Sequence, residues 1–197
     1  MRGFSKKSAA LGAITGGGLL AINIIWQGYL DLTLGGDSFL HDVTHFAYYL
    51  NTAMIFFAMC GLLIGLFSLH NHIKATKVNF LWRTGIFLSG LGQGLFGLGA
   101  LAFFVHGFLD LGSLHETVDL VAGISSIVMF LGALPLGIFL IRIKTFPRFG
   151  TILFLLTVPV VAVATTVIYN VNALIGGILF GGIYGLAWII TGFYLRK

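Results

Sequence analysis

Long apolar segments alternate with short polar segments along the whole chain. Six of the apolar segments exceed the ~18 residues that identify a candidate membrane-spanning helix. They lie at about 8–30, 41–69, 80–109, 115–143, 149–168 and 173–195. The pattern predicts an all-α integral membrane protein, with residues 1–197 forming a single domain. We expect six transmembrane helices arranged as three consecutive hairpins.

Composition supports this class. The chain is 58% hydrophobic and 9% charged, with a mean hydropathy of +1.02, whereas a soluble domain carries roughly 25% charged residues. The first apolar segment is too long for a cleavable signal peptide and lacks a small-residue cleavage site. The single Cys60 lies inside an apolar segment, so we expect neither a disulfide framework nor a redox motif.

The distribution of charge predicts how the helices are oriented. All eleven Lys and Arg residues fall at the two termini and in the loops on one side, and all six acids fall in or beside the other loops. Because Lys and Arg mark the cytoplasmic side, we expect both termini to be cytoplasmic. The expected location is a bacterial plasma membrane, with lipid head groups rather than nucleic acid as partners of the basic residues.

One short sequence motif occurs twice in the chain. Gly-aromatic-Leu-Asp-Leu stands at 28–32 and again at 107–111, and each copy is followed by a short loop and a Leu-His-acid sequence, at 40–42 and 114–116. Without gaps, residues 41–69 align with 115–143. Each hairpin contains an even number of spans, so the pattern predicts a parallel internal repeat of hairpins one and two about an axis along the membrane normal.

The repeated loops carry polar side chains spaced four residues apart, which places them one turn apart on one helix face. These pairs are Gln27 with Asp31, His41 with His45, His106 with Asp110, and His115 with Asp119. Imidazole and carboxylate groups suit zinc or a similar divalent ion. We therefore expect a metal site near the outer membrane boundary, with no haem or nucleotide. The predicted ligands are His41, His45, His106, Asp110, His115 and Asp119.

Glu116 and Asp42 are the candidate catalytic residues, because a nearby carboxylate can polarise a metal-bound water or orient a ligand histidine. A structural interpretation stays open beside this one. Ser113 with Glu116 fits a capping box, and Asp42 fits a cap of the second span. Capping does not explain the four outer histidines.

Polar residues also occur within the spans. Asn23, Asn51 and Gln93 either form interhelical hydrogen bonds or line a polar path. The candidate substrate-binding residues are Asp31, Gln27, Asn51 and Gln93.

Glycines at four-residue spacing in the last span (Gly177, Gly181 and Gly185) predict a packing stripe, used either within the chain or in a homo-oligomer.

A glycine-rich third span, Gly107-Phe108 at its end, Leu114-His115 opening a fourth span that contains Pro135, and 186–189 (Leu-Ala-Trp-Ile) occur in order. In these features the chain resembles a large uncharacterised family of small six-helix bacterial membrane proteins, which are distantly similar to the DRAM-type proteins of eukaryotes. The resemblance implies a six-helix bundle and no assigned activity. His41-x-x-x-His45 departs from that family.

The outer histidine and acid constellation is analogous to the zinc sites of alkaline ceramidases and progestin/adiponectin-type receptors, which have seven helices and a different motif order.

Three functions follow as hypotheses, and whether the protein is an enzyme stays open. One is a metal-dependent hydrolase acting on a lipid or amide. Another is a small-solute or cation transporter, or its substrate-binding membrane subunit. The last is a structural, sensory or immunity-type membrane protein.

Overall fold

The computed structural model describes residues 6–34, 42–73, 79–109, 112, 114–168 and 171–197. This part of the chain is helical and contains no β-strand. Six of its helical segments are long and apolar enough to cross a membrane, which confirms the predicted all-α class and the number of spans. The helices are α1 (Lys6–Leu34), α2 (Phe46–Ile73), α3 (Phe80–His106), α4 (Leu114–Leu140), α5 (Arg148–Val163) with its π-helical continuation η1 (Ala164–Ile168), and α7 (Ala173–Leu195).

The second helix is displaced along the chain from its predicted position. It begins at Phe46 rather than near residue 41, and it extends to Ile73 rather than 69. His70 and His72 therefore lie in its last turn, where a loop was expected. The His70 Nδ1 atom accepts a hydrogen bond of 3.1 Å from the Trp82 Nε1–H of α3. This bond fixes the end of α2 against the start of α3.

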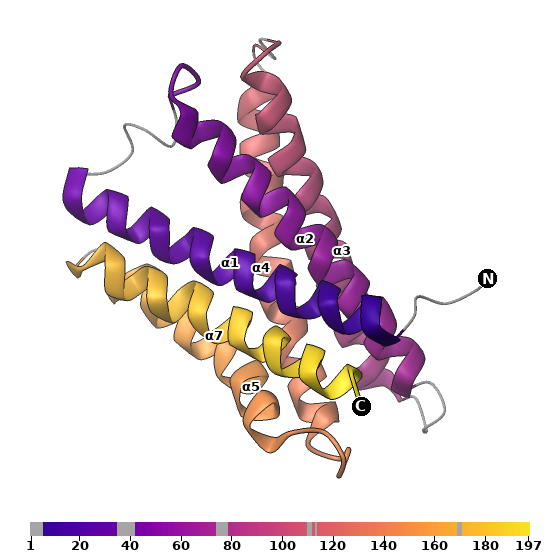
Figure 1. Cartoon of the computed structure of the whole chain (residues 1–197). Helices are drawn as coiled ribbons and strands as arrows, with labels where there is room; N and C mark the ends of the chain where they lie inside the picture. The colour runs from indigo at the N-terminus through magenta and orange to yellow at the C-terminus, as the bar shows by residue number, and fades with distance from the viewer. Residues whose placement is uncertain (1–5, 35–41, 74–78, 110–111, 113, 169–170) are drawn as a thin grey trace.

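Each helix packs against the next one in the chain, and α7 returns to pack along α1 (Figure 1). The result is a closed ring of antiparallel helices, with the start of α1 and the end of α7 at the same end. Short connections explain the contacts between chain neighbours. The contact between α1 and α7 joins the two ends of the sequence and must arise from the helix surfaces themselves.

Glycines create the contact between α1 and α7. A Cβ atom added at Gly17 would lie 2.5 Å from the Gly185 carbonyl oxygen, and one added at Gly185 would lie 2.5 Å from the Gly17 carbonyl oxygen. Gly177 and Gly181 likewise face Ile24 of α1. The predicted glycine stripe is therefore used within the chain, and a homo-oligomer stays a prediction.

The two ends of the bundle differ in charge. The described basic side chains lie at or near helix ends on the side of the bundle where α1 begins, which we call the basic end. They are Lys7, Arg83, Arg142, Lys144, Arg148, Arg196 and Lys197. The described acids lie at the opposite, acidic end; they are Asp31, Asp42, Glu116 and Asp119. This separation follows from the sequence pattern and the alternating direction of the helices.

Replacing Gly17 by alanine should lower the stability of the folded protein by about 1–3 kcal/mol, because the added methyl group collides with the α7 backbone. Gly18→Ala is the matched control, since a Cβ there meets no atom within 4 Å and alanine favours a helix by about 1 kcal/mol over glycine. Unfolding by SDS titration of the purified protein measures both. Equal effects of the two substitutions would refute the close α1–α7 contact.

Candidate functional site

Two of the predicted metal ligands come together at the acidic end. The rings of His106, at the end of α3, and His115, in the first turn of α4, have centroids 4.7 Å apart. His115 also packs edge-on against Phe103, at 5.2 Å between centroids. Asp119 lies one turn after His115 on α4. The paired spacing of His115 and Asp119 thus produces a shared helix face.

The predicted ligand His45, from the first hairpin, is placed differently from His106 and His115. Residues 42–45 form a turn before α2, in which the Thr44 N–H and hydroxyl both donate to Asp42 Oδ1, at 2.8 and 2.6 Å. His45 Nδ1 accepts from the Ala47 N–H at 3.1 Å and so caps the helix. Local hydrogen bonds of this kind compete with helix formation. His45 therefore lies in the turn before α2 rather than on a helix, and its expected partner on a shared helix face, His41, lies outside the described residues.

The Asp42 carboxylate serves the same turn. It is fully exposed, and its hydrogen bonds from the Thr44 hydroxyl and N–H, together with the nearby His45 ring, lower its pKa below the ordinary value. Asp42 thus stabilises the turn that precedes α2, and its catalytic role stays a prediction.

The metal site is not supported by the described residues, which contain no group of three or more His, Cys, Asp or Glu side chains placed to hold an ion. Two of the six predicted ligands, His41 and Asp110, lie outside the described residues. Helix α3 ends at His106, and the residues 107–109 that follow it form a turn rather than a further part of the helix. Glu116 is exposed in the first turn of α4.

Three amides form a hydrogen-bonded network between α1 and α2. Asn51 Oδ1 accepts from Asn23 Nδ2 at 2.8 Å and from Gln27 Nε2 at 2.6 Å. Gln27 Nε2 also lies 2.9 Å from Asn23 Oδ1. Two of the predicted substrate-binding residues, Gln27 and Asn51, are thus brought together. Asn23 and Asn51 form the interhelical hydrogen bond that was one of the two roles expected for polar residues within the spans.

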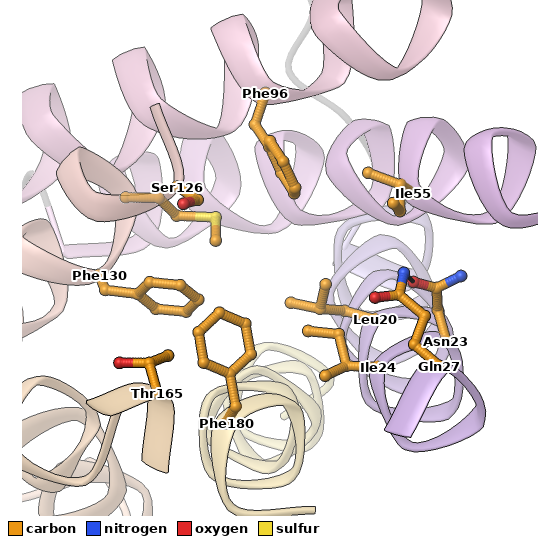
Figure 2. Close-up of a pocket in the computed structure, with 11 residues that line it drawn as sticks. Leu20, Asn23, Ile24, Gln27, Ile55, Phe96, Ser126, Phe130, Thr165 and Phe180 are labelled. Carbon is orange, nitrogen blue, oxygen red and sulfur yellow. Dashed lines mark hydrogen bonds between the residues drawn. The ribbon is translucent and has the colours of Figure 1, made fainter. Parts of the chain in front are cut away.

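The network borders a cavity of about 350 Å³ at the centre of the bundle, which we call the central cavity (Figure 2). Helices α1, α2, α3, α4 and α7 and the π-helical η1 all contribute to its wall. Figure 2 shows Asn23 and Gln27 on one side and Ser126 and Thr165 on the other. The lining residues are Leu20, Asn23, Ile24, Gln27, Ile55, Phe96, Ser126, Met129, Phe130, Thr165 and Phe180.

A second cavity of about 340 Å³, the acidic-end cavity, adjoins the first and shares Ile55 and Phe96 with it. His115 and Asp119 line this cavity, as does Asn51 of the amide network. Polar side chains therefore follow one another from the acidic end toward the middle of the bundle.

Gln93, in the middle of α3, lines neither cavity. Its Nε2 donates to the Tyr184 hydroxyl at 3.1 Å, and both side chains are fully buried. Within the described part of the chain, the neighbouring Ser89 Oγ and Trp188 Nε1 and the Gln93 Oε1 have no hydrogen-bond partner. The Phe130 ring packs against Tyr184, at 5.1 Å between centroids, and so stands between this polar cluster and the central cavity.

Asp31, also predicted to bind substrate, is half-buried near the end of α1 and lines neither cavity.

Sequence reasoning missed the far wall of the central cavity. Ser126 and Thr165 each belong to a pair of adjacent hydroxyl residues in an apolar segment, with Ser125 and Thr166, and neither pair shows a spacing that indicates a site. Nothing in the sequence marks η1 as π-helical, although Pro159 precedes it in α5. Tyr184 was detectable: Phe180, Tyr184 and Trp188 recur every four residues and thus share a helix face.

The chain matches no protein-family model, no curated protein and no solved structure. The resemblance to six-helix bacterial proteins therefore stays a prediction.

Asn51→Ala should lower the free energy of unfolding by about 1–2 kcal/mol, because Asn23 and Gln27 lose the oxygen that both donate to. Asn71→Ala on the same helix is the control: Asn71 is exposed, and its loss should change stability by less than about 0.5 kcal/mol. SDS titration compares the two variants. If Asn51→Ala is as stable as Asn71→Ala, the amide network does not hold α1 to α2.

Proposed function

We propose that this protein binds a small, uncharged and largely apolar solute in the central cavity and carries it across the membrane. The central cavity is the observation that supports the proposal most directly. Helices α1, α2, α3, α4 and α7, together with η1, line it, and it adjoins a second cavity that lies toward the acidic end. Small-molecule sites are commonly apolar cavities of ~300–1,000 Å³ with a few placed polar groups.

The lining defines the chemistry of the solute. No charged side chain stands among the described residues that line the central cavity, and an ion at this depth would be costly to bury without a partner. Amides on α1 and hydroxyls on α4 and η1 offer hydrogen bonds, while Phe96, Phe130 and Phe180 supply apolar walls. A compact alcohol or amide with an aliphatic or aromatic body satisfies these conditions.

The solute enters from the acidic end, past His115 and Asp119. The positive-inside rule assigns the basic end to the cytoplasm, so the acidic end faces outward from a bacterial plasma membrane. The His115 and Asp119 side chains line the acidic-end cavity and therefore border this path of entry.

A metal-dependent hydrolase is the second candidate, favoured by the contact between the His106 and His115 rings beside Asp119. It requires further ligands from His41, His45 or Asp110. Metal analysis of the wild-type protein beside His106→Ala/His115→Ala tests it. Stoichiometric zinc that the double variant loses would favour the hydrolase over the carrier.

Photolabelling with a diazirine-bearing aliphatic alcohol tests the proposed binding site. In lipid nanodiscs, the wild-type protein should give adducts at peptides containing Ser126, Phe130 or Phe180. Ser126→Trp, which fills the central cavity, should reduce these adducts by about tenfold, the loss expected when binding weakens by roughly 1.4 kcal/mol.

Ile127→Trp is the matched control, because the neighbouring Ile127 is 60% exposed on the outside of α4. It should leave the cavity adducts unchanged. Adducts confined to lipid-facing positions in every variant, with an excess of unlabelled alcohol displacing none, would contradict a solute site in the central cavity.

A further inference from the structure

A groove of about 500 Å³ lies at the basic end, between the end of α4 and the start of α5, remote from the central cavity. Its floor is a close helix contact, since a Cβ added at Gly137 of α4 would lie 2.9 Å from Leu155 Cδ2 of α5. Apolar side chains of Ile141, Ile152 and Leu155 form its walls, and Lys144 and Arg148 stand at its rim.

The groove combines two chemistries. Ile141 is 62% exposed and Ile152 is 48% exposed, although both are large apolar side chains. Lys144 and Arg148 are also exposed, and no acid stands among the described residues that line the groove. The ligand that fits must be amphipathic, with an anionic group at the end of an apolar chain.

We propose that this groove binds one anionic phospholipid of the leaflet at the basic end. Lys144 and Arg148 contact the phosphate, and an acyl chain lies along Ile141, Ile152 and Leu155. Arginine pairs with phosphate through two parallel hydrogen bonds, while lysine contributes a compact positive charge. Basic pockets between transmembrane helices are suited to such head groups.

Charge and shape distinguish this ligand from other occupants. Free phosphate would leave the apolar walls uncovered. A second copy of the chain in a two-fold contact would place Lys144 and Arg148 against the same residues, which is electrostatically unfavourable. The lipid satisfies both parts of the groove at the depth where charged and apolar regions of a membrane meet.

Native mass spectrometry of the detergent-purified protein tests the proposal with dioleoyl phosphatidylglycerol and dioleoyl phosphatidylcholine. The wild-type protein should retain the anionic lipid about tenfold more strongly, given the attraction of two cations near the membrane surface. Lys144→Gln/Arg148→Gln should remove this preference. Lys7→Gln/Arg83→Gln removes the same charge from the basic end outside the groove and should keep the preference within about twofold.

A second pair of variants tests the apolar walls. Ile152→Ser should weaken retention of the dioleoyl lipid, whereas Ile178→Ser, at an exposed position on α7, should not. Circular dichroism identifies any variant that fails to fold, and such a variant is replaced by its single-substitution form. Equal loss in both charge variants, or displacement of the lipid by millimolar inorganic phosphate, would overturn the proposal in favour of general surface attraction or a free phosphate site.

Discussion

The backbone contact between α1 and α7 is the interaction on which the rest of the structure depends. Within a membrane, lipid chains are as apolar as the helices, so association relies on close packing rather than on the hydrophobic effect. Gly17 and Gly185 permit that approach. Because α1 and α7 are the first and last helices, their contact closes the chain of hairpins into a ring. The central cavity, lined by α1, α2, α3, α4, η1 and α7, lies within that ring.

Helix α1 illustrates how one segment contacts two neighbouring helices and also lines the central cavity. Gly12 and Gly16 face α2, while Gly17 and Gly28 face α7. Asn23 and Gln27 lie on the side of α1 that faces α2, and both border the central cavity. Amides at this depth are costly unless they are hydrogen-bonded, and Asn51 provides the shared acceptor. The same side chains therefore hold α1 to α2 and supply the polar edge of the proposed solute site.

Hydropathy was sufficient to predict six helices, since each backbone must satisfy its own hydrogen bonds in lipid. It did not give the start of α2, because the turn at Asp42 and Thr44 depends on local side-chain bonds that helical periodicity ignores. Gln27 and Asn51 stood out as amides in apolar segments. Ser126 and Thr165 did not, because their importance arises only when α4 and η1 meet α1 across the closed ring. Contacts between segments far apart in the chain produce no recognisable residue spacing in the sequence.

The buried cluster around Gln93 and Tyr184 bears on how far the polar region extends. Three polar atoms of this cluster lack partners among the described residues, which is unfavourable in a water-poor interior. The Phe130 ring contacts both Tyr184 and the Phe180 ring of the central cavity. The polar cluster therefore lies behind the Phe130 wall of the central cavity. Polar groups there would suit a carrier, which needs them along its path toward the basic end, whereas a purely structural bundle would be more stable with apolar side chains in these positions.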